Sequence, residues 1–348
     1  MSYTNGLDKP SDYFNTVLYT GNNTDNTSIS GLDFQPDWVW LKARNQADYH
    51  YSMDSVRGAL KPLFQNDTSA EANFSDSLKS FNTDGFTLGT SGDLNAASQT
   101  MVAWNWKAGT SFTNDASSTG IGSIDSTGSV NTDAGFSIIS YTGTGSNATI
   151  AHGLGVTPDV IIAKSRASVE GWGFFHSSFS SQEYMFLNTT SPKGSASTVW
   201  NALPGSAVFT VGSNGSVNAS GTMIAYCFAE KQGYSKFGSY TGNGNADGTF
   251  VYTGFKPAFV MTKPSNKTGE WFMIDNKRDP SNYVRRRLKA NSNAAENTDD
   301  NQDFDILSNG FKPRRSAGDW NSSGDTFIYM AFAENPFVTS TGVPATAR

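Results

Sequence analysis

One sequence pattern occurs three times in this chain of 348 residues, and it constrains the fold more than any other feature. Each copy reads as a strand, a polar turn and a second short strand, followed by a proline and an apolar strand. The Tyr-Thr-Gly triplets of the copies begin at Tyr19, Tyr141 and Tyr240, which are 122 and then 99 residues apart. The matching prolines have the same two separations and are Pro36, Pro158 and Pro257. This agreement predicts a tandem array of one structural module.

Each copy also closes on an apolar strand, at Met101–Trp106, Met223–Phe228 and Phe327–Phe332. The final aromatic residues of the first two are again 122 apart, whereas the third module carries five extra residues. Because a chain of this length exceeds the usual size of one core, we expect three modules of about 100 residues. The predicted organisation is an arm at 1–11, modules at 12–107, 135–232 and 233–336, a linker at 108–134 and a tail at 337–348.

The composition favours strands joined by tight turns. Gly, Asn, Ser, Thr and aromatic residues are frequent, whereas the helix formers Leu, Glu and Lys are scarce. In the strand Asp37–Ala43 two tryptophans alternate with Val39 and Leu41, so we expect it to be buried on both faces. The fold class expected is all-β, with three tandem antiparallel β-sandwich modules that resemble jelly rolls. Eight strands are predicted in the first module, at Phe14–Thr20, Thr27–Ser30, Asp37–Ala43, Tyr49–Asp54, Leu60–Gln65, Leu78–Phe81, Gly85–Gly89 and Met101–Trp106.

The segment Ala108–Ala134 differs in composition from the rest of the chain. It consists almost entirely of Gly, Ser, Thr, Asn and Asp, which predicts an extended or flexible linker between the first two modules. The alternative is an added strand at Ile121–Val130, where Ile121, Ile124 and Val130 are apolar.

Charge and cysteine content exclude several classes of function. The formal net charge of −6 and the pI of about 5.1 argue against general nucleic-acid binding, which needs a basic surface. The single cysteine, Cys227, lies in an apolar strand and cannot form a disulfide within the chain. Neither a secretory signal nor an apolar run long enough to span a membrane is visible, so we expect a protein made in the cytoplasm.

No catalytic, metal or cofactor site is predicted. Gly143–Ala148 fits the dinucleotide pattern G-x-G-x-x-A, but the glycines and Pro158 that follow will not support the helix this pattern needs, so a hairpin turn is expected. The three histidines, His50, His152 and His176, have no metal-site spacing. Asp299, Asp300, Asn301, Asp303 and Asp305 could supply oxygen ligands for Ca²⁺, but they lack the loop Gly and the final Glu, which favours a solvated loop.

Aromatic and basic residues in the middle of each module are the candidate binding residues. Tyr49, Tyr51, Trp172, Trp271 and Tyr283 fall where loops meet strands, and exposed aromatic platforms of this kind hold sugars or partner surfaces. Trp38, Trp40, Trp104 and Trp106 are instead expected to pack in the core or between modules. Arg285 and Arg286 begin a basic run that is interpreted as a solvated strand or as a contact for an acidic partner or an anionic glycan.

Six stretches carry a resemblance to a known family: Phe14–Gly21, Gly31–Lys42, Asp54–Gly58, Thr132–Gly143, Gly233–Gly244 and Tyr329–Phe337. Through them the chain resembles a repeat family of structural proteins from marine tailed bacteriophages. The family brings no catalytic motif, and the second module departs from it most, with His176-Ser177 in place of Met53-Asp54.

This resemblance implies a virion component that is assembled in the host cytoplasm. We expect a homo-oligomer that contacts other capsid or tail proteins, with neither nucleic acid nor membrane insertion. The first hypothesis is tail-fibre-like host attachment, in which several weak sites for a surface glycan act together. The second is capsid decoration or a tail adaptor, in which the aromatic residues contact other subunits. A polysaccharide depolymerase is the third, and it would need two carboxylates in one groove.

Overall fold

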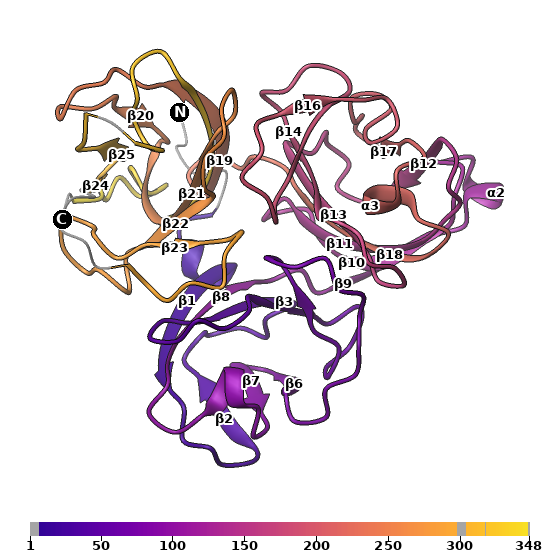
Figure 1. The fold of residues 1–348 in the computed structure, drawn as a ribbon, viewed down its shortest axis with the longest axis horizontal. Helices are drawn as coiled ribbons and strands as arrows, with labels where there is room; N and C mark the ends of the chain where they lie inside the picture. Colours follow the sequence, from indigo (N-terminus) through magenta and orange to yellow (C-terminus); the bar gives the residue numbers. More distant parts are fainter. Residues whose placement is uncertain (1–6, 298–303, 317, 347–348) are drawn as a thin grey trace.

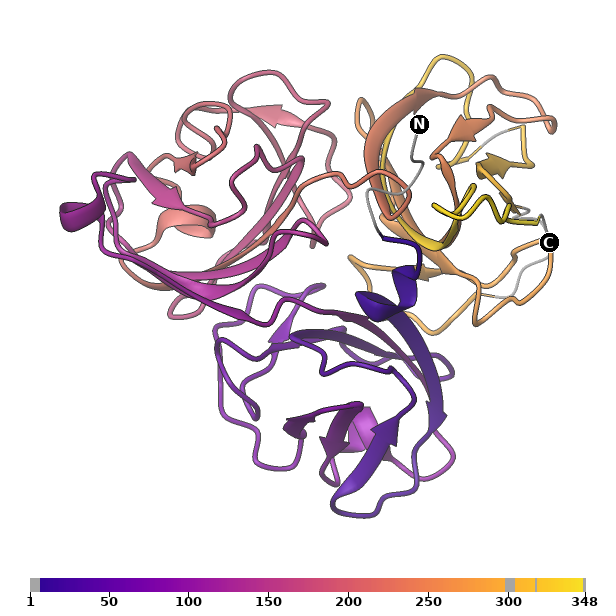
Figure 2. The same cartoon turned by 180° about the vertical axis from the view of Figure 1, so that it is seen from behind.

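The fold is all-β, as the repeat and the composition predict, and it forms three lobes around a common centre (Figure 1). The computed structural model describes residues 7–297, 304–316 and 318–346. We call residues 7–107 the first lobe, 108–230 the second and 231–346 the third. In each lobe a large antiparallel sheet lies toward the centre and a small sheet lies outside it, which is also visible from behind (Figure 2).

The first lobe has a five-stranded sheet in the order β1-β8-β3-β4-β5 and a three-stranded sheet in the order β2-β7-β6. All eight strands predicted in this lobe are present, some of them shorter than expected. The 3₁₀ helix η1 (Pro10–Asp12) precedes them, and the short helix α1 (Gly92–Asn95) follows β7. The strands are β1 (Phe14–Thr20), β2 (Thr27–Ser30), β3 (Trp38–Ala43), β4 (Tyr51–Asp54), β5 (Leu63–Phe64), β6 (Leu78–Asn82), β7 (Gly85–Leu88) and β8 (Thr100–Trp106).

The third lobe repeats this order, and the second repeats it in its large sheet with the added strands β9, β10 and β16 and has a small sheet of two strands. The third has sheets β19-β26-β21-β22-β23 and β20-β25-β24, and the second has β16-β15-β14-β13-β18-β11-β10-β9 and β12-β17. The strands of the second lobe are β9 (Thr110–Asn114), β10 (Ser126–Asn131), β11 (Phe136–Gly143), β12 (Ala148–Ala151), β13 (Val160–Ser165), β14 (Gly173–His176), β15 (Glu183–Phe186), β16 (Gly194–Ser195), β17 (Val208–Val211) and β18 (Gly221–Phe228), with short helices α2 (Ala116–Thr119) and α3 (Gly215–Asn218). Those of the third are β19 (Ser235–Thr241), β20 (Val251–Tyr252), β21 (Phe255–Pro264), β22 (Phe272–Asp275), β23 (Leu288–Lys289), β24 (Phe304–Leu307), β25 (Gly310–Pro313) and β26 (Thr326–Pro336).

The prediction of a flexible linker at Ala108–Ala134 is wrong, and the alternative of an added strand is closer. This segment forms β9, α2 and β10, and β10 pairs along β11 from Ser126 opposite Tyr141 to Asn131 opposite Phe136. The edge of β11 offers unpaired peptide groups, and the small polar residues of the segment allow a strand to lie there while Val130 is buried. Composition alone therefore misidentified a strand pair as a linker.

The large sheets are buried on both faces because their inner faces meet in a central core shared by all three lobes. In β3, Trp38 and Trp40 belong to this central core, while Val39 and Leu41 belong to the core of the first lobe, as the alternation predicted. Trp38 of the first lobe stacks on Tyr226 of the second with ring centroids 4.4 Å apart. Phe332 of the third lobe lies 5.1 Å from Phe14 and 5.7 Å from Phe228. The inter-module packing expected of the tryptophans is therefore present.

The Tyr-Thr-Gly triplet closes each lobe around a buried asparagine. The hydroxyl of Tyr141 donates to the carbonyl oxygen of Val217, and Tyr19 and Tyr240 make the equivalent bond in their lobes. A side chain on Gly143 would clash with the carbonyl oxygen of Ala219. Asn218 accepts from the backbone N–H of Thr144 at 2.9 Å and donates to the carbonyl oxygen of Gly212 at 2.8 Å. In the second lobe these contacts hold the chain between Gly143 and Ala148 as a turn into β12, not as the start of a helix.

Buried ion networks join the first lobe to each of its neighbours. Asp54 and Arg57 pair at 2.6 Å with both side chains fully buried, and Tyr226 of the second lobe donates to Asp54 at 2.7 Å. The same arrangement recurs where the third lobe meets the first: Arg278 pairs with Asp275, and Trp104 donates to Asp275 at 3.1 Å. The repeat therefore supplies an equivalent Asp-Arg pair at two of the three junctions.

The junction between the second and third lobes is built differently. The strand register corrects the sequence alignment by one residue, because His176, and not Ser177, occupies the position of Asp54. His176 lies 3.1 Å from the carbonyl oxygen of Tyr329. Trp271 donates to the carbonyl oxygen of Phe186 at 3.2 Å, as Trp172 donates to that of Phe64 at the first junction. This junction therefore relies on hydrogen bonds to backbone carbonyls where the others use ion pairs.

Candidate functional site

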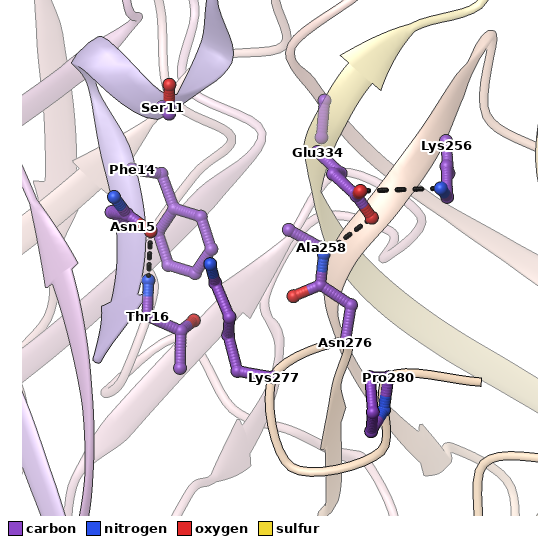
Figure 3. A pocket seen from close by; sticks show the side chains of 11 residues that line it. Ser11, Phe14, Asn15, Thr16, Lys256, Ala258, Asn276, Lys277, Pro280 and Glu334 are labelled. Carbon is purple, nitrogen blue, oxygen red and sulfur yellow. Dashed lines mark hydrogen bonds and ion pairs between the residues drawn. The ribbon is translucent and has the colours of Figure 1, made fainter. Parts of the chain in front are cut away.

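A large pocket lies between the first and third lobes (Figure 3). Its volume is about 640 Å³, and it is open to solvent. One wall is the start of β1 with η1, and the other is formed by β21, the loop after β22 and the end of β26. The lining residues are Ser11, Phe14, Asn15, Thr16, Lys256, Ala258, Asn276, Lys277, Pro280, Ala333 and Glu334.

The β1 wall carries a hydroxyl group that has no hydrogen-bond partner. The side-chain oxygen of Asn15 accepts from the backbone N–H of Thr16 at 2.9 Å. Thr16 itself is only 5% exposed, and its Oγ1 has no partner among the described residues. A buried polar atom without a partner costs free energy unless a ligand or water reaches it, so this hydroxyl is available to an occupant of the pocket.

The opposite wall presents two ammonium groups and one carboxylate. Glu334 accepts from Asn276 at 2.6 Å and lies 3.3 Å from Lys256 Nζ. The backbone N–H of Asn276 donates to the carbonyl oxygen of Ala258, which fixes the loop against β21. Lys277 is exposed, and in the described part of the chain its ammonium group forms no ion pair. Figure 3 shows its side chain running from this loop toward β1.

The charges in this pocket favour an anionic group over a cation. Lys256 is paired with Glu334, whereas Lys277 has no ion pair among the residues that the structure describes. A carboxylate placed between Lys277 and Thr16 would gain a charge-assisted hydrogen bond and would also satisfy the Thr16 hydroxyl. The arrangement suits binding.

A second, smaller pocket has an aromatic wall that the sequence analysis did not single out. It has a volume of about 170 Å³ and is lined by Tyr252, Glu230, Gln232, Ser235 and Lys236, among others. Tyr252 is 52% exposed, and Lys236 pairs with Glu230 at 2.7 Å beside it. An exposed ring next to paired polar groups is the arrangement expected of a sugar subsite.

The proposed binding role is wrong for three of the five predicted aromatic residues, because they are buried. Trp172 is 0% exposed and Trp271 1% exposed, and both anchor junctions between lobes. Tyr51 is 4% exposed, and its hydroxyl donates to Asp93 at 2.7 Å. Position at a loop–strand edge in the sequence did not reveal that a neighbouring lobe would cover Trp172 and Trp271, or that the core of the first lobe would bury Tyr51.

The remaining predicted residues are accessible but lie outside the large pocket. Tyr49 and Tyr283 are 43% and 49% exposed, and Tyr49 packs on Phe64 with ring centroids 4.9 Å apart. The backbone N–H groups of Arg285 and Arg286 both donate to Asp279, and the Arg286 side chain lies 3.4 Å from this carboxylate. None of these four residues lines the large pocket.

Within the described residues, no cluster of three or more His, Cys, Asp or Glu side chains is placed to hold a metal ion. Four members of the acidic candidate set, Asp299, Asp300, Asn301 and Asp303, lie outside the described residues. Cys227 is buried, and burial raises the pKa of its thiol to about 12. None of the described helices is both long enough and apolar enough to cross a membrane.

One protein-family model matches residues 9–336 of the chain, and its description is "Domain of unknown function (DUF7483)". The match covers all three lobes, including the strands that line the large pocket. No curated protein matches the chain.

Proposed function

The chain belongs to the DUF7483 family, whose description assigns no function. From the sequence resemblance together with the geometry, we propose that it is a structural protein of a bacteriophage particle. The observation that carries this proposal is that the first lobe is locked to both neighbours by buried ion networks around one shared aromatic core. A chain built in this way is a rigid block whose outward surface is free for contacts with other proteins.

The residues that carry the resemblance to phage structural proteins have structural positions in this block. Asp54–Gly58 contains the Asp-Arg pair at the first junction, and Tyr329 accepts from His176 at the third. Phe14–Gly21 forms β1 and the triplet that closes the first lobe. The family signatures thus coincide with residues that fix the lobes, which supports a structural building block in place of a reaction centre.

The test is the composition and the density map of the purified phage particle. We expect the chain in the particle by mass spectrometry, in a fixed ratio to the major capsid or tail protein. Cryo-electron microscopy should place the three-lobed block at repeated positions against other virion proteins. Absence of the chain from particles that remain infective would refute the proposal.

Attachment to a host-surface glycan is the second candidate, and the small pocket beside Tyr252 is the observation in its favour. The burial of Trp172 and Trp271 removes two of the aromatic surfaces on which this role was first based. Glycan binding therefore depends on Tyr252, with Lys236 and Glu230 as polar neighbours.

Binding of the purified protein to host cells and to a glycan array tests this candidate. Tyr252→Ala should abolish the signal, whereas Tyr49→Ala, which removes a similarly exposed ring in another lobe, should leave it unchanged. Equal binding by both variants, or no binding by the wild-type protein, would exclude this pocket as a glycan site.

A further inference from the structure

Strand β1 has an open edge beside the large pocket. In the described part of the chain it pairs only with β8. The backbone N–H of Lys107 donates to the carbonyl oxygen of Tyr13, and the backbone N–H of Gly21 donates to that of Gln99. The peptide groups of the odd-numbered residues in this stretch therefore point toward β8. Because antiparallel pairing alternates, the peptide groups of Thr16 and Leu18 point away from β8. The backbone N–H of Thr16 confirms this direction, since its bond goes to the Asn15 side chain.

The equivalent edge in the second lobe is occupied by the chain itself. There β11 corresponds to β1, with Ile138 in the place of Thr16, and β10 pairs along it with Ser129 opposite Ile138. Ser129 and Thr127 face a pocket of about 380 Å³. The segment 108–134 thus shows which kind of chain fits this edge: an extended strand of small residues.

The two pockets are repeat equivalents of each other. The walls of the occupied site include Gln35, Asp37, Ser55 and Val56, and residues 221 positions later, Lys256, Ala258, Asn276 and Lys277, line the larger one. This offset of 221 positions is the sum of the two repeat separations, 122 and 99 residues. Where β10 is present the volume is about 380 Å³, and where no such strand lies it is about 640 Å³. The larger pocket is therefore the repeat equivalent of the smaller one, without a described strand in the position that β10 takes.

We propose that the open edge of β1 and this pocket bind an extended acidic segment of another polypeptide. The segment adds a strand to the sheet of the first lobe, as β10 does to that of the second. Its backbone pairs with the outward carbonyl oxygen of Thr16 and the outward peptide groups of Leu18, while the Thr16 N–H keeps its bond to the Asn15 side chain. A carboxylate side chain opposite Thr16 reaches Lys277 and the unpartnered Thr16 hydroxyl. The inference does not depend on the proposed function, because it rests only on the edge and the pocket.

Charge distinguishes this edge from its occupied equivalent. In the occupied pocket Val56 takes the position of Lys277, and Gln35 takes the position of Lys256. The occupied pocket thus lacks both lysines, which fits the uncharged residues of β10. The third lobe has a similar edge on β19, which pairs only with β26 among the described strands. Its outward residue equivalent to Leu18 is Ser239, which provides a matched control.

Fluorescence anisotropy with two labelled peptides tests the proposal on the full-length protein. One peptide has the sequence of residues 124–133, and the other carries Ser129→Asp, which places a carboxylate opposite Thr16. We expect saturable binding of both, with the Ser129→Asp peptide bound about tenfold more tightly because it alone places a carboxylate opposite Thr16. Leu18→Pro removes one outward N–H and should weaken both peptides about tenfold.

Two further variants separate the proposal from its alternatives. Lys277→Glu leaves the backbone unchanged and should reverse the preference between the peptides, whether or not Leu18→Pro folds. Ser239→Pro alters the other open edge and should change neither affinity. No saturable binding, or binding lost in Ser239→Pro but kept in Leu18→Pro, would overturn the proposal. A dimer in sedimentation velocity that Leu18→Pro abolishes would likewise overturn it, because the occupant would then be a second copy.

Discussion

The carboxylate of Glu71 in the first lobe accepts two hydrogen bonds from the guanidinium group of Arg166 in the second, at 2.9 and 2.8 Å. Arg57 also approaches this carboxylate at 3.1 Å. Burial alone would raise the pKa of Glu71, but the bonds from Arg166 and the charge of Arg57 lower it below its usual value. Glu296 and Arg44 repeat the arrangement between the third lobe and the first. These carboxylates therefore act as fixed negative charges between lobes.

We predict that Arg57→Met destabilises the protein by about 3–5 kcal/mol, because it leaves Asp54 buried without its positive partner. The free energy of unfolding from urea denaturation measures this effect. Lys236→Ala is the matched control, since its pair with Glu230 is partly exposed, and it should change stability by less than about 1 kcal/mol. Similar losses for the two variants would contradict a special role for the buried network.

Arg278→Met should repeat the loss at the other junction, because Arg278 and Asp275 are equally buried. The double variant Asp54→Leu/Arg57→Met removes both charges at once and should recover part of the stability lost in Arg57→Met. If the double variant is less stable than the single one, hydrogen bonds to Arg57 matter more than charge balance.

We predict that Gly21→Ala destabilises the first lobe by about 1–3 kcal/mol, because the added methyl group would clash with the carbonyl oxygen of Ala96. Gly92→Ala is the control in the same lobe. Its added methyl group meets nothing within 4 Å, and it lies at the start of α1, where alanine is favourable. Thermal unfolding should show a loss for the first variant and no loss for the second.

Local sequence patterns were sufficient to predict most of the fold of the first lobe. The period-two alternation and the turn residues located all eight strands of the first lobe, and the four tryptophans were correctly expected in a core. The pairing of Tyr19 with Leu94 and the clash that requires Gly21 explain why the triplet repeats. These features depend on contacts within one repeat, so the repeat itself reveals them.

Contacts between residues far apart in the sequence could not be predicted from local patterns. Trp172 and Tyr51 resemble exposed platforms in the sequence, because nothing local shows that another lobe or a distant helix covers them. The strand β10 was not predicted for a related reason, because its residues form a strand by pairing with the edge of β11. The large pocket joins β1 to residues at least 240 positions later, and only the arrangement of the lobes brings them together.

We predict that stability rises with pH between about 8 and 10. Lys42, Lys164 and Lys263 are 0% exposed, and burial lowers the pKa of each to about 8. An unfolded lysine keeps its proton to about pH 10.5, so the unfolded state binds more protons in this window, and stability increases by about 1 kcal/mol per pH unit for each lysine. Urea denaturation at several pH values measures the slope.

Lys164→Met should make that slope shallower, and a slope unchanged in this variant would show that Lys164 does not titrate near pH 8. Above about pH 10 the trend should reverse. Burial raises the pKa of Tyr19, Tyr141 and Tyr226 well above the usual value, so the unfolded state loses these protons first. Stability is then expected to fall as the pH rises further.

We predict a loss of stability as the pH falls from about 6.5 to 4, caused by the buried histidines. Burial lowers the pKa of His176 to about 4, although its bond to the Tyr329 carbonyl opposes this shift, and burial likewise lowers the pKa values of His50 and His152. The unfolded state binds more protons in this window, so unfolding is favoured as the pH falls. His176→Gln should retain a side-chain donor to Tyr329 and flatten the slope by about one third, since it removes one of three titrating groups. Glu71 and Glu296 have lowered pKa values, so they change stability only at pH values below about 4.5. If the slope above pH 5 is the same in His176→Gln as in the wild-type protein, groups other than His176 cause the loss of stability.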